Sequence, residues 1–102
     1  MERYRVFETA NFRKRKKRLD GSEFQWFLKI VEELKIRPRG KPLVFSWFCE
    51  KKYHNKRLFF MIDENTKRVL ILDFGTKKEQ QKIIDFVLKN KNELFTYLRS
   101  KL

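Results

Sequence analysis

One carboxylate and two cations lie close together near the middle of the chain, on either side of the dipeptide His54-Asn55. This dipeptide fits the two-residue turn of a β-hairpin, because Asn, and less so His, tolerates the left-handed backbone that the turn needs. A hairpin with this turn sets Lys52 opposite Arg57. Because alternate residues of a strand point to the same side, Glu50, Lys52 and Arg57 then share one face of the sheet.

This combination of groups suits RNA cleavage without a metal ion. Such cleavage needs a base for the 2′-hydroxyl proton, cations that stabilise the charged phosphate in the transition state, and an acid for the leaving 5′-oxygen. We expect two further lysines at the start of a helix beside the hairpin, where free backbone N–H groups also favour a phosphate. The candidate catalytic residues are therefore Glu50, Lys52, Arg57, Lys77 and Lys78.

Glu50 is the candidate general base, and we expect Arg57, exposed on this face, to bind the phosphate. A surface ion pair of Glu50 with Lys52 and Arg57 is an equally good interpretation of the residues alone, and Tyr53 or His54 could replace Glu50 as the base. The acidic residues are scattered, with no pair of carboxylates at a strand end, so we expect neither a metal site nor a cofactor.

The composition indicates a polyanionic partner. The 102 residues include 26 Lys and Arg against 13 Asp and Glu, which gives a net charge of +13. Six consecutive basic residues, Arg13–Arg18, stand between Phe12 and Leu19, and this spacing predicts a thin amphipathic helix from Asn11 to Asp20. The alternative for this helix is a solvated charged face.

Aromatic side chains of the hairpin could stack on unpaired bases. By strand alternation, Phe48 and Phe59 are expected on the exposed face with Glu50, whereas Trp47, Cys49, Leu58, Phe60 and Ile62 should face a core beneath the helices. The predicted RNA-binding residues are Arg13, Lys14, Lys17, Lys51, Tyr53 and Phe59.

The elements that must position these residues follow an α+β order, β-α-α-β-β-β-α, in one domain over residues 1–102. Two expected capping boxes, Ser22–Gln25 and Thr76–Glu79, begin the second and last helices. The polar run Lys89–Glu93 should interrupt the last helix and lead into a helical extension at 90–102. The remaining expected elements are strands at 3–9, 43–53, 56–62 and 68–74 and helices near 11–20 and 22–36. In the helix at 22–36, the apolar residues at helical spacing are Phe24, Phe27, Leu28, Val31 and Leu34.

The order of several short motifs, YRVFET, FRKRKKRLD, RPRGKPL, EKKYHNKRLFF and FGTKKEQQKII, resembles the RelE/ParE toxin superfamily over about residues 3–88. The resemblance implies a RelE-like, archaeal-type toxin of a type II toxin–antitoxin system. It also implies a twisted antiparallel sheet with a helical hairpin on one face. The expected activity is cleavage of mRNA on the ribosome, blocked by a cognate antitoxin.

The resemblance also assigns functional roles to individual residues, according to their positions in these motifs. The resemblance gives phosphate binding to Arg57, a second-strand basic position to Lys52, and the basic residue after the last strand to Lys77 or Lys78. Two positions depart from the family, because Glu50 stands where many relatives have Lys, and Ile84 lies near a Tyr that some relatives use.

Two other functions stay open: a ParE-like poison of a DNA topoisomerase, and a non-catalytic nucleic-acid-binding module. The retained lysines and Glu50 favour the nuclease. We expect a cytoplasmic protein without a membrane partner, because the sequence shows neither a signal peptide nor a long apolar run. The resemblance further implies a hetero-oligomer with the antitoxin.

Overall fold

The computed structural model describes residues 3–101, which form one five-stranded sheet and three helices. The predicted α+β class and element order are confirmed, with one additional strand of two residues, β2. In chain order the elements are β1 (Arg5–Glu8), α1 (Ala10–Lys16), α2 (Gly21–Ile36), β2 (Lys41–Pro42), β3 (Phe48–Tyr53), β4 (Lys56–Asp63), β5 (Arg68–Thr76) and α3 (Lys77–Arg99).

The sheet is mixed rather than wholly antiparallel. Its strand order is β1-β5-β4-β3-β2, and β1 pairs with β5 in parallel while the other neighbours are antiparallel. β5 has strands on both sides and helices over both faces, so almost its whole length is buried. This burial explains its continuous apolar sequence, which is typical of strands covered on two faces.

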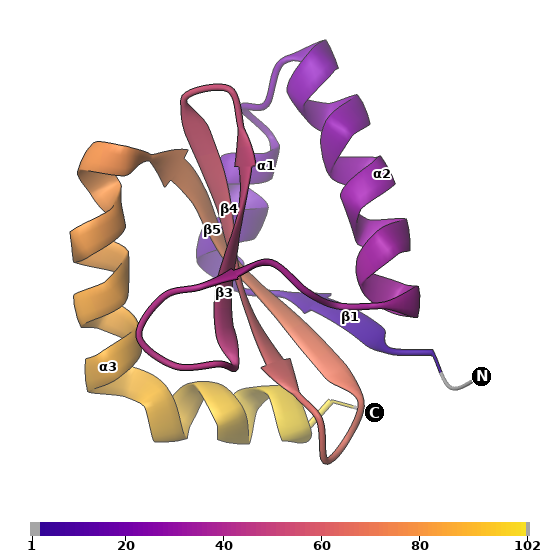
Figure 1. Cartoon of the computed structure of the whole chain (residues 1–102), viewed down its shortest axis with the longest axis vertical. Coiled ribbons are helices and arrows are strands. Elements are labelled where there is room, and N and C mark those ends of the chain that lie inside the picture. Colours follow the sequence, from indigo (N-terminus) through magenta and orange to yellow (C-terminus); the bar gives the residue numbers. More distant parts are fainter. Residues whose placement is uncertain (1–2, 102) are drawn as a thin grey trace.

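Helices lie on both faces of the sheet (Figure 1), and each face carries its own apolar cluster. Helices α1 and α2 cover one face, where Phe12, Phe27 and Leu34 meet the alternate strand residues Leu58 and Phe60. Helix α3 covers the other face, with buried residues Phe48, Phe59, Met61, Leu70, Leu72, Ile83, Val87, Leu94 and Leu98. The sheet is thus the middle of three layers, with α1 and α2 on one side and α3 on the other.

The buried stripe of α2 is narrower than its sequence predicts. Phe27, Ile30 and Leu34 are buried, whereas Phe24 and Leu28 are exposed. Phe24 and Leu28 thus follow the predicted helical spacing without being buried, because only one edge of the helix lies against the sheet.

The first two helices begin elsewhere than predicted. Thr9, not Asn11, caps α1, since its hydroxyl accepts a hydrogen bond from the backbone N–H of Phe12 at 3.0 Å. The capping box of α2 joins Asp20 and Glu23 instead of Ser22 and Gln25. In both helices the side-chain oxygen that acts as the cap belongs to a residue two positions before the predicted one, and it reaches the free N–H groups of the first turn.

Helix α3 begins and bends where the sequence indicates. The predicted capping box of Thr76 and Glu79 is present, and the non-helical residue Asn90 (φ −114°, ψ 19°) lies within the predicted interruption. The helix nevertheless continues beyond this kink to Arg99, and its second part turns under the sheet (Figure 1). Of the described helices, none is long and apolar enough to cross a membrane.

The predicted strand 43–53 forms only from Phe48 onward, because residues 43–47 make bends and turns. Trp47 consequently packs against the α3 cluster, stacked near Phe45 and edge-on to Phe95, rather than under α1 and α2 as predicted. The other residues assigned to the core beneath the helices, Cys49, Leu58, Phe60 and Ile62, do lie there.

Candidate functional site

The hairpin of β3 and β4 has the predicted register. His54 adopts the left-handed conformation (φ 53°), and the turn sets Lys52 opposite Arg57 and Glu50 opposite Phe59. On the far side of β4, Arg57 lies opposite Gly75 of β5. The sequence therefore predicts correctly which side chains come together on this part of the sheet.

Glu50 is the centre of this group of side chains, and it is buried, with 6% of its surface exposed. Its Oε2 lies 3.2 Å from Arg57 Nε and accepts a hydrogen bond from Gln80 Nε2 at 2.8 Å. Arg57 Nε, also buried, has no hydrogen-bond partner of good geometry in the described range 3–101, so the pair is ionic without an aligned N–H. We call Glu50, Arg57 and Gln80 the Glu50 site.

The prediction that Arg57 is exposed is wrong, since only 12% of its side chain is accessible. The sequence shows the strand positions but not what lies over them. Here the first turn of α3 contributes Gln80, which covers the carboxylate of Glu50. The arrangement can hold a carboxylate and a guanidinium together in a region of little water, where their charges act strongly.

Lys41 also lies beside the Glu50 site, and sequence reasoning missed it. β2 pairs Lys41 with Glu50, so the two side chains project from the same face of the sheet. The preceding Gly40 permits this pairing, because a Cβ there would lie 2.6 Å from the carbonyl oxygen of Glu50. A strand of two residues has no periodicity, and the close approach that demands Gly40 is visible only in three dimensions.

The two lysines at the start of α3 take different flanks of the helix. Lys77 precedes Gln80 by three residues and so shares its flank, beside the Glu50 site. Lys78 precedes Lys82 by four residues and belongs to the opposite flank. Lys52, Lys77 and Lys78 are exposed, and none forms an ion pair within residues 3–101.

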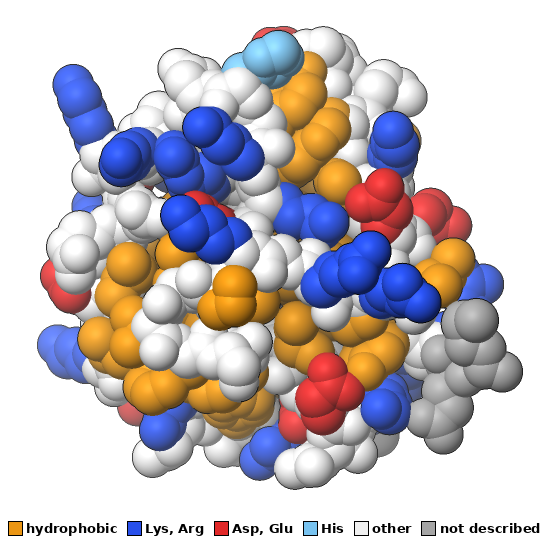
Figure 2. Space-filling view, viewed as in Figure 1, with side chains coloured by type: hydrophobic (Ala, Val, Ile, Leu, Met, Phe, Trp, Pro, Cys, Tyr) orange, Lys and Arg blue, Asp and Glu red, His pale blue; other side chains and the backbone are white. Residues whose placement is uncertain are grey.

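Figure 2 shows Lys and Arg side chains gathered over the end of β5, the start of α3 and the neighbouring hairpin. A second group lies over the segment that joins α2 to β3, which contains the exposed residues Arg37, Arg39 and Lys41. Such a surface attracts phosphates whatever their sequence.

The predicted aromatic platform is not present on this face. Phe48 and Phe59 are 0% exposed because α3 covers them, so the prediction that they are accessible to bases is wrong. Tyr53 and Lys51 lie on the opposite side of the sheet from Glu50. Tyr53 packs against Trp26 with 4.9 Å between ring centres, and Lys51 pairs with Glu33.

The basic block is an ordered helix over its first part, and only some of its charges face solvent freely. Arg13 donates to the carbonyl of Glu8 and to Tyr97, and Arg15 pairs with Asp73 and Glu79. Lys14 and Lys17, by contrast, are exposed and form no ion pair in the described part of the chain. Lys14 and Lys17 are the members of the predicted RNA-binding set whose charged groups have no partner in the described part of the chain.

Two other candidate groups, His54 and Cys49, differ in exposure. His54 lies exposed at the turn, and burial raises the pKa of the Cys49 thiol, which favours its uncharged form. Among residues 3–101, no three His, Cys, Asp or Glu side chains converge to hold a metal ion.

No protein-family model matches the sequence, and no curated protein matches it in sequence, so the comparison depends on the fold. Among solved structures, the chain resembles the free state of a double mutant of the E. coli toxin RelE, with a TM-score of 0.73 and 16% identity. That match covers 86% of this chain and 97% of the toxin. The fold is RelE-like.

Two complexes extend the likeness. The toxin of the E. coli RelBE toxin–antitoxin complex has a TM-score of 0.65 and 17% identity, over 72% of this chain and 95% of that one. The archaeal RelE–RelB complex from Pyrococcus horikoshii has a TM-score of 0.57 and 16% identity, over 72% and 94%. The predicted resemblance to RelE, archaeal RelE included, is thus confirmed at the level of structure.

Proposed function

We propose that this RelE-like protein is the toxin of a toxin–antitoxin pair and cleaves mRNA on the ribosome without a metal ion. The observation that supports this proposal is the Glu50 site, in which a buried carboxylate and a guanidinium lie 3.2 Å apart with an unaligned N–H. Lys41, Lys52 and Lys77 surround the site from three different elements.

The proposed roles follow from the chemistry of each group. Glu50 takes the proton of the 2′-hydroxyl, and Arg57 stabilises the negative charge that develops on the phosphate. Lys77, with the free N–H groups at the start of α3, binds the same phosphate or its neighbour, and Lys52 is available to protonate the leaving oxygen. Lys14, Lys17 and Lys78 bind more distant phosphates, which adds affinity but no sequence preference.

Substrate has to compete for Arg57. In the free protein its Nε faces Glu50 without a good hydrogen bond, so a phosphate that offers aligned oxygens gains a strong interaction. Once Arg57 turns to the phosphate, the Glu50 carboxylate keeps only the hydrogen bond from Gln80 and is free to accept a proton. The ion pair is thus the resting state of the proposed site.

A cognate antitoxin is the proposed partner, in a cytoplasmic hetero-oligomer. The two complexes described above each contain a RelE toxin and RelB. A short acidic protein encoded beside this gene would supply a partner complementary to the charge of +13.

Glu50→Gln tests the nuclease most directly. The amide keeps the shape of the side chain but cannot act as a base, so we expect cleavage to slow by about 10²–10⁴. The measurement is the mapping of new mRNA 5′ ends after induction in cells, repeated with purified ribosomes. Glu64→Gln, an exposed carboxylate at the β4–β5 turn, is the matched control. Cleavage by Glu50→Gln at the parental rate would contradict the proposed role.

A non-catalytic nucleic-acid-binding module is the second candidate. It is favoured by the internal pairing of Glu50 with Arg57, which a purely structural ion pair would also show. Ribosome or RNA binding with intact transcripts would support this candidate, whereas DNA damage with intact transcripts would indicate a topoisomerase poison.

A further inference from the structure

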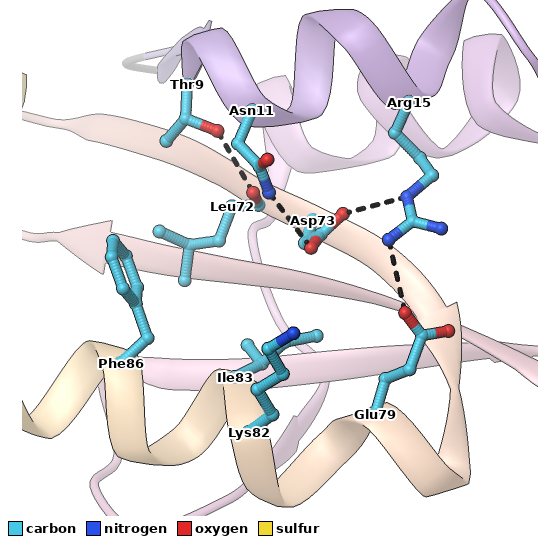
Figure 3. Close-up of a pocket in the computed structure, with 9 residues that line it drawn as sticks. All are labelled: Thr9, Asn11, Arg15, Leu72, Asp73, Glu79, Lys82, Ile83 and Phe86. Atoms are coloured by element: carbon cyan, nitrogen blue, oxygen red, sulfur yellow. Dashed lines mark hydrogen bonds and ion pairs between the residues drawn. The ribbon is translucent and has the colours of Figure 1, made fainter.

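A pocket of about 410 Å³ lies on the flank of α3 that faces away from the Glu50 site. Figure 3 shows it between α1 above, the end of β5 behind and the first half of α3 below. Leu72, Ile83 and Phe86 make it apolar, and the Phe86 ring, 53% exposed, stands at its side. A half-exposed aromatic ring beside a pocket of this size is a common feature of binding surfaces.

Most polar groups around the pocket are already bonded to one another. Asn11 donates to Asp73 at 3.1 Å, Thr9 donates to a carbonyl of β5 at 3.0 Å, and Arg15 lies 3.4 Å from Asp73 and 3.1 Å from Glu79. The pKa of Glu79 is lowered by the backbone N–H of Thr76 and by Arg15, so this carboxylate stays charged and paired.

Lys82 is the exception. It lines the pocket and is exposed, and no ion pair or hydrogen bond of its side chain occurs within residues 3–101. Lys78, one turn earlier on the same flank, and Lys14 on α1 are likewise exposed and without an ion pair in that range. The pocket therefore offers an apolar floor with unpaired positive charge at its edge.

We propose that this pocket binds an acidic, amphipathic segment of a protein partner. An apolar side chain of the segment would pack on Leu72, Ile83 and Phe86, and a neighbouring carboxylate would pair with Lys82. This geometry is that of a helix or turn docking in a groove, in which apolar anchors give affinity and charge gives orientation. If the proposed function holds, the partner is the antitoxin.

An RNA base fits the pocket less well. Recognition of a base requires free donors and acceptors for its edge, and here the amide of Asn11 and the carboxylate of Asp73 already bond to each other. A peptide side chain needs no such groups. The charge complementarity between an acidic segment and this strongly basic chain also favours the peptide.

NMR titration of the full-length protein tests the proposal. The probe is a helical peptide of about 15 residues with Leu on one face and Glu elsewhere. Its matched control has Lys in place of each Glu, and a short single-stranded RNA is the third ligand. We expect the acidic peptide to shift the methyl signals of Leu72 and Ile83, with those of Val69 and Leu58 unchanged.

Two variants make the test specific. Phe86→Ser and Lys82→Glu should each weaken binding of the acidic peptide by about tenfold, because each removes one proposed contact. Lys89→Glu, an exposed change further along α3, should leave the affinity unaltered. Because the signals report binding without cleavage, this test is independent of the nuclease assay on Glu50→Gln.

Three results would overturn the inference. The basic peptide could bind as tightly as the acidic one, the methyl signals of Leu72 and Ile83 could stay unchanged, or the RNA alone could shift them. The last result would assign the pocket to nucleic acid. If cleavage is observed but the peptide does not bind, only the pocket proposal fails.

Discussion

Asp63 and Glu50, two of the buried carboxylates that pair with arginines, differ in how completely they are hydrogen-bonded. Asp63, 3% exposed, receives Arg99 Nε at 2.8 Å and a second guanidinium nitrogen at 3.2 Å, and Thr66 donates to it at 2.6 Å. Glu50 accepts a hydrogen bond from Gln80 and is paired with Arg57 Nε, which has no hydrogen-bond partner of good geometry among residues 3–101.

The difference separates a structural role from a candidate chemical one. Around Asp63 the donors are aligned, and hydrogen bonding by Arg99 lowers the pKa of the carboxyl, so the pair secures the end of α3 to the β4–β5 turn. Around Glu50 a buried donor is left unsatisfied, which is uncommon in folded proteins and costs stability unless a ligand completes it. A pair that is poorly bonded at rest is the one available to a substrate.

The largest expected effect is the loss of unfolding free energy when the arginine of one pair, Arg57 or Arg99, is replaced by alanine. Arg57→Ala leaves Glu50 buried without its counter-ion and should cost about 3–5 kcal/mol of unfolding free energy. Arg99→Ala should cost about 1–2 kcal/mol, because Arg99 is 47% exposed and Asp63 keeps other donors. Urea unfolding at neutral pH measures both values, and equal losses would contradict the distinction between the pairs.

An intermediate effect concerns acid stability. Because the pKa of Asp63 is lowered in the folded protein, its contribution is fully present above the unfolded pKa of about 4 and is lost as the pH falls below that value. Asp63→Asn should therefore be less stable at pH 6 and should lose less stability between pH 5 and pH 2. Denaturation midpoints across this range test the prediction, and parallel curves for parent and variant would contradict it.

The smallest expected effect compares the neutral donors of the two pairs. Gln80→Leu removes the hydrogen bond that orients Glu50 and should slow the proposed cleavage by about tenfold, the equivalent of one hydrogen bond to a charged group. Thr66→Val removes a donor from Asp63 and should leave the cleavage rate unaltered. Single-turnover cleavage rates, with each variant's fold checked by circular dichroism, decide the matter. Equal rates for Gln80→Leu and the parent would show that Gln80 does not position Glu50.

Local rules were enough for the hairpin that holds Glu50 and Arg57. A two-residue turn at His54-Asn55 permits one register, and strand alternation then assigns each side chain to a face. Local sequence patterns also predicted the capping box of Thr76 and Glu79 and the interruption of α3 near Asn90.

Which helix covers each face of the sheet could not be predicted from such local rules. Alternation places Phe59 beside Glu50 correctly, but it cannot show that α3 folds back over that face and encloses the ring. The parallel partner of β1 and the two-residue strand that brings Lys41 to Glu50 both depend on contacts between distant parts of the chain. The mispredicted residues near the Glu50 site, Arg57, Phe48 and Phe59, are ones whose environment is made by another element.

The parallel pairing of β1 with β5 has a consequence for biosynthesis. β1 is translated before β5, its parallel neighbour in the sheet, and before Gln80, which hydrogen-bonds to Glu50. Contacts between such distant segments form slowly and only after both have emerged. A nascent chain therefore lacks a finished Glu50 site until β5 and the start of α3 have both emerged.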